Sequence, residues 1–384
     1  MSEIIQFTQV EGLPRIRYAS PPTPFYKELR KRIHAHFEEN DLSRYADIRM
    51  YGKTVFLLSL WVLLFALILS NQFQGIALIG LQVVWHSVMF LMTVGIAHDA
   101  SHGAYSSKPW VNRLWNNVFD IVGINSYIWE FNHVKSHHNA PNIPIYDSAI
   151  DSFVLFRFHP RSVYKSFHRY QHIYIWGIYA MATMFKLFFL DFFSFRRKRI
   201  GFVNVEGHPT SEILRLIFIR SFVILYTLIL PLVYLDAPIW QILTGFVIGH
   251  MISGLALGVI FQTTHLSNRT EWPEPNEEGV IENSFDQHIL ATTADYCPTS
   301  RVITWISGGL NLHVIHHLFP GYCQIHLLEM TRILREVAEE YGVNYHVYER
   351  LPDAVRSHTQ TLKMLGDPDH LPQMPAAFTI PAVS

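Results

Sequence analysis

The chain has 384 residues, of which 49% are hydrophobic and only 16% charged, and its formal net charge is −1. Soluble domains carry about 25% charged residues, so this composition indicates a membrane protein. The balanced charge, with no basic stripe interleaved with aromatic residues, excludes a nucleic-acid partner. Two cysteines without a CxxC pair exclude a disulfide framework or a thiolate metal site.

Residues 1–50 are polar and contain the charged helical run KELRKRIHAHFEEN, which does not resemble a signal peptide. We expect a cytoplasmic N-terminal segment whose basic helix meets lipid headgroups or an acidic protein. Residues 51–345 then form one membrane domain, and residues 346–384 a C-terminal tail. Toward the C-terminus, IHLLEMTRILREVAEEYG at residues 325–342 predicts an amphipathic helix, and GDPDHLPQMPAAFTIPAVS at 366–384 is typical of extended or disordered chain.

Five stretches approach the length of about 20 apolar residues that a membrane span needs. They are residues 54–70, 75–97, 173–193, 213–235 and 239–261. The linkers 71–74 and 236–238 are short and carry no Lys or Arg. The sequence therefore predicts two helical hairpins, made from the first pair and the last pair of stretches.

The third stretch, residues 173–193, contains Lys186 and Asp191 and is followed by the basic run FRRKR at 195–199. Basic segments stay in the cytoplasm. If this stretch crossed the membrane, the histidines before it and after it would face opposite sides. We therefore predict an interfacial helix here. The expected fold is an all-α membrane protein with four transmembrane helices as two hairpins, interfacial helices and a cytoplasmic, histidine-rich helical cap.

Histidine is strongly over-represented, with 22 residues, and it clusters just outside the predicted spans. The clusters are HDASH (98–102), HVKSHH (133–138) and HVIHH (313–317). Residues four apart share one face of a helix, which pairs His98 with His102, His133 with His137 and His313 with His317. The neighbouring His138 and His316 extend the clusters toward a second metal. Eight imidazoles exceed the four ligands of one structural zinc, so their number favours two metal ions.

His265 lies just past the end of the last predicted span and is the expected ninth ligand. The alternative to metal binding is that these histidines are hydrogen-bonded polar residues in surface loops. Other polar side chains are candidates to orient the imidazoles through their second nitrogen. They are Asp99, Asn132, Gln262, Asp295 and Asn311.

With these motifs in place, the chain resembles the integral-membrane fatty acid desaturases, a family with histidine boxes and a di-iron centre. The resemblance covers roughly residues 50–345 and rests on the three histidine clusters, on HILATTADY before the third, and on GGLNLHVIHHLFPGYCQIHL around it. It departs from one common pattern at His313, where many members have Gln, and at Ile315, where Glu is common. The position of the double bond therefore stays open.

The resemblance implies two iron ions (Fe2+/Fe3+) held by the box histidines and His265, with O2 as co-substrate. It implies removal of two hydrogens from an acyl chain linked to lipid, coenzyme A or acyl carrier protein. It also implies electrons from ferredoxin or a cytochrome b5-like protein, which should be a separate chain because no His-Pro-Gly-Gly haem element occurs in the sequence. A bacterial plasma membrane or the endoplasmic reticulum would suit it, with the site on the cytoplasmic face.

Two alternatives stay open at this point. The same boxes serve di-iron hydroxylases and acetylenases that act on acyl chains or other hydrocarbons, and spacing does not separate them from desaturases. A histidine-rich metal transporter would instead place its ligands inside the spans near the bilayer midplane.

Overall fold

Helices make up most of the computed structural model, which describes residues 13–150, 154–205, 207–367 and 369. The longer helices are α1 (Pro24–Glu39), α2 (Ile48–Leu69), α3 (Gly75–Met92), α8 (Gln171–Phe185), α10 (Thr210–Ile224), α12 (Ile239–His265), α16 (Leu327–Glu340) and α17 (Leu351–Leu365). The shorter ones are α4 (His98–Ser101), α5 (Pro109–Asn116), α6 (Val118–Ile121), α7 (Ser126–Trp129), α9 (Asp191–Ser194), α11 (Leu230–Tyr234), α13 (Phe285–Thr292), α14 (Arg301–Ser307) and α15 (His313–Leu318).

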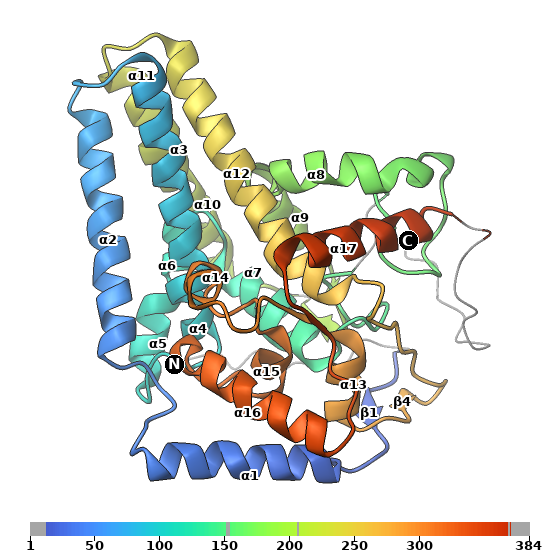
Figure 1. Cartoon of the computed structure of the whole chain (residues 1–384). Helices are drawn as coiled ribbons and strands as arrows, with labels where there is room; N and C mark the ends of the chain where they lie inside the picture. The colour runs from blue at the N-terminus through green and yellow to red at the C-terminus, as the bar shows by residue number, and fades with distance from the viewer. Residues whose placement is uncertain (1–12, 151–153, 206, 368, 370–384) are drawn as a thin grey trace.

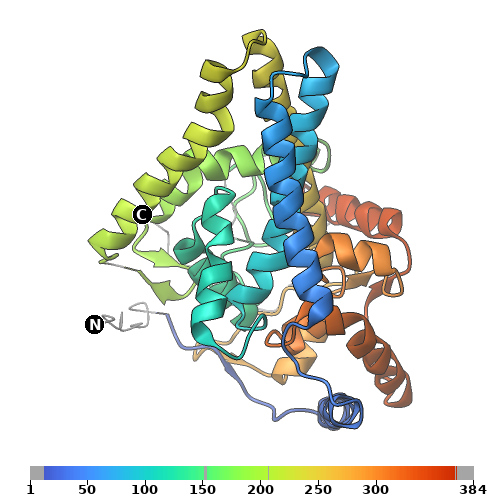
Figure 2. The same ribbon diagram turned by 90° about the vertical axis from the view of Figure 1, so that its left-hand side faces the viewer.

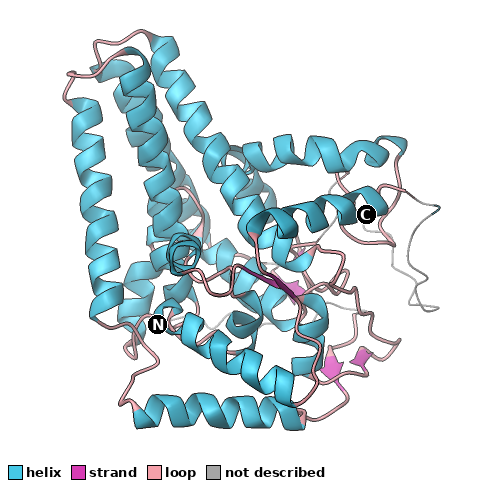
Figure 3. Ribbon diagram, viewed as in Figure 1, coloured by secondary structure: helices cyan, strands magenta, loops and turns pink. Residues whose placement is uncertain are grey.

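Two-residue strands pair in three places and join loop segments (Figure 3). They are β1 (Arg17–Tyr18) parallel to β4 (Val280–Ile281), β2 (Arg199–Ile200) antiparallel to β3 (Val203–Asn204), and β5 (Asp295–Tyr296) parallel to β6 (Val347–Tyr348). Several helices also contain wide, π-helical turns, in which the chain bonds five residues ahead. These turns are Thr93–Ala97, Glu130–Ser136, Lys186–Leu190 and Leu225–Ile229.

Each of the five predicted apolar stretches falls within or overlaps a helix long and apolar enough to cross a membrane. These helices are Ile48–Leu69, Gly75–Ser101, Ser166–Ser194, Thr210–Tyr234 and Ile239–His265. The first begins earlier than predicted, because the side chain of Asp47 caps it by accepting the backbone N–H of Arg49 (2.8 Å). In Figure 1, the axes of α2, α3 and α12 run in the same general direction, and α8 lies to the right of α12 and extends sideways from it. Figure 2 shows α10 and α11 rising beside the bundle.

Glycines on α12 allow both α3 and α8 to approach it closely. A Cβ added to Gly249 would lie 2.7 Å from Cγ of His86 on α3. A Cβ added to Gly254 would lie 2.3 Å from the backbone oxygen of Tyr179 on α8. Contacts this short leave no room for a methyl group, so the two helices are seated on α12 through its glycines.

The charged end of the third apolar helix lies in a buried ion cluster with α10. Lys186 Nζ lies 2.9 Å from Oδ1 of Asp191, and the guanidinium of Arg220 contacts Oδ2 of the same carboxylate. Asp191 and Arg220 are both buried. The backbone N–H of Asn125 donates to Asp191 as well (3.0 Å). Asp191 therefore fastens this helix to α10 and to the loop before α7, and Lys186 pairs with Asp191 within the same helix.

The remaining helices gather at the end of the bundle where α3 and α12 finish (Figure 1). The predicted amphipathic helix is α16, which packs on α1 through a shared apolar core. The segment expected as the C-terminal tail, residues 346–384, contains α17, a helix that the sequence did not identify. Nδ1 of His358 on α17 donates to the carbonyl of Leu266 (2.8 Å), and Nε2 accepts from the Tyr179 hydroxyl (3.0 Å). The expected disordered run lies mostly outside the described residues.

Candidate metal centre

The structure brings the nine predicted histidines together into two adjacent groups. In each group, the candidate ligand nitrogens all lie within 4.8 Å of one another. The first group contains His98, His102, His133, His138 and His316. The second contains His137, His265, His313 and His317. Eight of the nine side chains are buried, and His102 is partly exposed.

Each cluster begins or ends a helix that the sequence places at this end of the bundle. His98 and His102 follow the π-helical turn that ends α3, and His265 is the last residue of α12. His313, His316 and His317 lie on the short helix α15. The two long apolar helices α3 and α12 therefore deliver ligands directly from the membrane bundle.

The pairing predicted for the second cluster is wrong. His133 and His137 were expected to share a face at i,i+4, but they lie in different groups. The backbone from Glu130 to Ser136 is π-helical, and a 3₁₀ turn follows at His137–Asn139. A π-turn brings residues five apart onto one face. His133 consequently pairs with His138, whose Nε2 lies 3.2 Å from Nε2 of His133.

Nitrogens of the first group converge on a common point. Nε2 of His133 lies 2.9 Å from Nε2 of His98, and Nε2 of His138 lies 3.2 Å from Nε2 of His316. With metal–nitrogen bonds of about 2.0–2.1 Å, neighbouring ligand nitrogens lie roughly 2.9–3.4 Å apart. The observed separations match that spacing, so this group fits a single metal ion.

In the second group, hydrogen bonds at Nδ1 hold three of the imidazoles. Nδ1 of His265 lies 3.1 Å from the carbonyl of Thr292, and Nδ1 of His313 lies 3.1 Å from the carbonyl of Leu310. A carbonyl only accepts, so both Nδ1 atoms carry the proton and both Nε2 atoms keep a lone pair. These Nε2 atoms are buried and have no hydrogen-bond partner among the described residues. Buried nitrogens that keep a lone pair and have no hydrogen-bond partner are suited to bind a metal ion.

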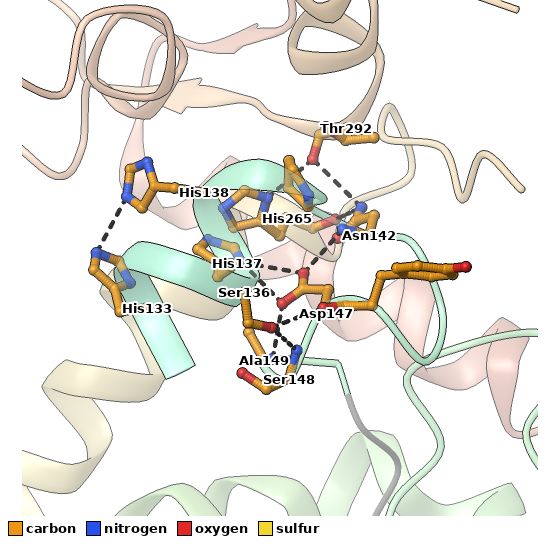
Figure 4. A network of polar contacts seen from close by, with 12 residues as sticks. His133, Ser136, His137, His138, Asn142, Asp147, Ser148, Ala149, His265 and Thr292 are labelled. Carbon is orange, nitrogen blue, oxygen red and sulfur yellow. Dashed lines mark hydrogen bonds and ion pairs between the residues drawn. The ribbon is translucent and has the colours of Figure 1, made fainter. Parts of the chain in front are cut away.

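The third of these imidazoles, His137, is held by Asp147 (Figure 4). Nδ1 of His137 lies 3.1 Å from both carboxylate oxygens of Asp147. Backbone N–H groups of Asn142 (2.9 Å) and Ala149 (2.8 Å) donate to the same carboxylate. Burial favours the protonated acid, but His137 and these donors outweigh it and hold the pKa of Asp147 below its usual value. Sequence reasoning missed Asp147, because it lies ten residues from His137 in a loop without helical spacing.

Asn142 joins this loop to the rest of the site (Figure 4). Its amide nitrogen donates to the backbone carbonyls of His265 (2.9 Å), Glu271 (3.0 Å) and Thr292 (3.3 Å). Its own backbone has a positive φ of 59°, a conformation that Asn tolerates better than most residues. One buried side chain therefore fixes the loop of Asp147 against the end of α12.

Two of the predicted orienting residues brace the helix that carries the third cluster. Oδ1 of Asp295 accepts the backbone N–H of Val314 (2.8 Å) at the start of α15, and Oδ2 accepts the Tyr345 hydroxyl. Burial raises the pKa of Asp295 to about 7. Asn311 accepts from Ser307 (2.9 Å) and donates to the carbonyl of Tyr296 (3.0 Å). Both residues support the backbone near His313, and neither is hydrogen-bonded to an imidazole among the described residues.

Other predicted orienting residues lie elsewhere. Asp99 was expected to orient its neighbour His98, but it accepts the backbone N–H of Gln324 (2.9 Å). Nδ1 of His98 is buried without a partner among the described residues. Asn132 and Gln262 take part through their backbone carbonyls, which accept from Ser148 (3.0 Å) and Leu266 (2.8 Å). No hydrogen bond joins their side chains to a histidine in the part of the chain that the structure describes.

Burial favours the uncharged form of five imidazoles that lie outside the apolar helices. It lowers the pKa of His102 to about 3, and it lowers the pKa of His133, His138, His316 and His317 well below the usual value, with neighbouring histidines adding to the effect. Neutral imidazole is the form that binds metals. The site is therefore prepared for metal binding at neutral pH.

Comparison with known proteins agrees with this arrangement. Residues 71–349 match the family model described as fatty acid desaturase. The chain is 31% identical over 352 residues to an sn-1 linoleoyl-lipid 6-desaturase from Arthrospira platensis, covering 89% of this chain and 92% of that protein. It is 29% identical to the Synechocystis sp. protein of the same name, covering 95% and 98%. It is 28% identical to an acyl-lipid (8-3)-desaturase from Mortierella alpina, covering 90% and 78%.

The family match spans most of the chain, including the three histidine clusters and His265, and all five apolar helices overlap it or precede it directly. A metal transporter is not favoured, because the histidines gather at one end of the bundle and the relatives are enzymes. The chain belongs to the fatty acid desaturase family, and it is an integral membrane oxidoreductase that introduces a double bond into an acyl chain.

Proposed function

We propose that the two histidine groups hold two iron ions, one in each group, and that the enzyme uses O2 and two electrons to desaturate an acyl chain. The observation that carries this proposal is the convergence of nine mostly buried imidazoles into groups of five and four. Imidazole suits iron as well as zinc and copper. Iron is preferred because breaking an unactivated C–H bond requires a redox-active metal. When bound, the two irons supply that oxidising power.

The residues of this chain would hold and shield that chemistry. Nε2 atoms of His137, His265 and His313 face the second site, because their Nδ1 atoms are hydrogen-bonded elsewhere. Phe261, one turn before His265, lies beside both groups, with its ring centroid 5.9 Å from that of His133 and 6.2 Å from that of His313. An acyl chain lying against this ring would be close to both groups and shielded from water.

For the topology, we propose four spans in two hairpins, α2 with α3 and α10–α11 with α12, and an interfacial position for α8. Support comes from α8 extending sideways from α12 and from the buried ion cluster at its end. Residues 51–345 would then form the membrane desaturase domain, with all nine histidines on the cytoplasmic face of a bacterial plasma membrane or the endoplasmic reticulum. Labelling of residues 196–199 from one side of sealed vesicles tests this placement.

For the substrate, we propose an acyl chain esterified to a membrane lipid, as in the names of the relatives. The name 6-desaturase further suggests a double bond near the carboxyl end of the chain. Electrons would come from a separate ferredoxin or cytochrome b5-like protein.

The decisive experiment compares fatty acids of cells that express the wild type, His317→Ala or His34→Ala. His317 is buried with both ring nitrogens unpartnered among the described residues, whereas His34 is exposed and outside both groups. We expect a new unsaturated fatty acid with the wild type and His34→Ala only. Elemental analysis of the purified wild type should find two irons per chain. One zinc per chain, or only hydroxylated products, would overturn the proposal.

A further inference from the structure

Beside the first histidine group lies an open recess of about 410 Å³ that the proposed chemistry does not use. Its polar lining residues are Ser101, Ser106, Ser107, Asn112, Arg113 and Asn116. Tyr45 and Glu130 complete the polar wall. The volume suits a small polar group rather than an acyl chain.

The recess lies next to the first histidine group, and its wall contains chain neighbours of His102. Ser101 and Gly103, which flank His102, are part of its wall, and Glu130 begins the π-helical turn that carries His133. His102 is also the one member of the two groups that is not fully buried. A group bound in the recess would therefore lie only a few atoms from the first metal site.

Helix α5 forms one side of the recess and has two different faces. Asn112, Arg113 and Asn116 line the recess. On the outer side, Trp110 is 59% exposed and Leu114 is 52% exposed. A short helix with exposed Trp and Leu on one face and polar residues on the other is typical of a membrane interface. The recess consequently lies at the level where lipid headgroups would be found.

The charges of the recess indicate the chemistry of its ligand. Arg113 is its lining cation and Glu130 its lining anion, and Glu130 forms an ion pair with Lys135 (2.7 Å). Coenzyme A and acyl carrier protein bring phosphates, which proteins bind with several cations or with arginine forks. Here hydroxyl and amide groups dominate. Asn116 is half-buried and lines the recess, so its side-chain amide can hydrogen-bond to a hydroxyl bound there.

We propose that this recess binds the uncharged, hydroxyl-bearing headgroup of the acyl lipid while its acyl chain enters the metal site. The proposal deepens the proposed function and rests on it. If the double bond is made near the carboxyl end, few carbons separate the ester from the reacting carbon. The headgroup must then lie close to the metal site, and this recess lies beside the first histidine group. Asn116 and Arg113 supply hydrogen bonds to it, and the serines around Ser107 supply more.

The test uses full-length protein in lipid nanodiscs, with Asn116→Leu and Arg113→Ala as variants. Lys108→Ala is the control, because Lys108 is exposed beside the recess but does not line it. Substrates carry one acyl chain on a glycosyl lipid, on phosphatidylcholine, on coenzyme A or as the free acid. Loss of a single hydrogen bond weakens binding affinity by about 3- to 10-fold. We expect KM for the glycosyl lipid to rise by that factor in both variants, with kcat and the KM for the free acid unchanged.

Direct labelling separates this proposal from the proposed function, because it requires no turnover. A glycosyl lipid with a photoreactive headgroup should label residues 101–116 of metal-free protein, and Asn116→Leu should reduce the label. Labelling elsewhere overturns the headgroup site even if the enzyme is active. A variant effect on KM for the electron donor alone also overturns it, because the recess would then be a donor-docking surface. Wild-type protein that labels at 101–116 but forms no double bond would instead contradict the proposed function.

Discussion

Replacing Asp147 by Asn should weaken one metal site and leave the other intact. Asp147 is fully buried, and both of its oxygens lie 3.1 Å from Nδ1 of His137. Backbone N–H groups donate to each oxygen as well, from Ala149 to Oδ1 and from Asn142 to Oδ2. In Asn, one of these positions becomes an amide N–H2 group, which faces a donor in either orientation. In either orientation the loop loses one backbone hydrogen bond, and the imidazole keeps one neutral amide oxygen in place of a charged carboxylate.

The expected size follows from this geometry. A hydrogen bond to a charged group contributes about 1.5–3 kcal/mol, and loss of a partner behind a metal-bound histidine costs about 10- to 100-fold in metal affinity. The two figures agree, because 10- to 100-fold corresponds to about 1.4–2.8 kcal/mol. We therefore expect one of two metal ions to bind about 10- to 100-fold more weakly.

The assay is titration of iron into metal-free protein in detergent, under reducing conditions and without oxygen. Asp120→Asn is the matched control, since Asp120 is also a buried carboxylate, bonded to Ser126 and Arg215 and outside both histidine groups. Wild-type affinity at both sites in Asp147→Asn would refute the assignment of His137 as an oriented ligand. An equal loss in Asp120→Asn would show that the effect is general destabilisation.

Three further outcomes are expected. Asp295→Ala removes the acceptor of the Val314 N–H and of the Tyr345 hydroxyl and should destabilise the protein by about 1–3 kcal/mol in thermal unfolding, with Tyr345→Phe costing less; an unchanged melting temperature contradicts this role. Gly254→Ala places a methyl group against the backbone of Tyr179 and should lower the free energy of unfolding by about 1–3 kcal/mol or more. Gly177→Ala on α8 should be tolerated, because nothing lies within 4 Å of the added Cβ. Equal stability of the two variants would show that α8 does not pack closely on α12. Finally, burial holds the pKa values of several candidate ligand imidazoles well below the usual 6.5, so these imidazoles are already neutral at pH 6.5. Calorimetry in buffers of different ionisation enthalpy should therefore find almost no proton release from them on metal binding. Release approaching one proton per histidine pair would contradict their neutral state.

The sequence predicted the apolar helices, and it identified the nine histidines that the structure gathers into two groups, because both features leave local signals. Long apolar runs identify helices such as α12, and histidines three or four apart identify clusters such as His313 and His317. Interactions between distant segments leave no such signal. Thr292 meets His265 only through folding, 27 residues along the chain, and Asp147 meets His137 from a loop ten residues away. Thr292 and Leu310 bind through backbone carbonyls, which any residue could supply. Helix α17 was missed because its apolar residues are interrupted by polar ones that become buried, such as His358.

The misassigned partner of His133 has a physical reason that also explains the division into five and four. In an α-helical second cluster, His133 and His137 would face one metal, and His138 would point about a quarter-turn away. The π-helical turn widens the spacing, so that His133 and His138 join the first group. The 3₁₀ turn that follows places His137 in the second group, where the Asp147 carboxylate accepts a hydrogen bond from its Nδ1–H. One short segment thus supplies ligands to both groups, and it does so because its backbone departs from the regular helix. A spacing rule based on the α-helix identifies the residues of such a cluster but not their division between two metals.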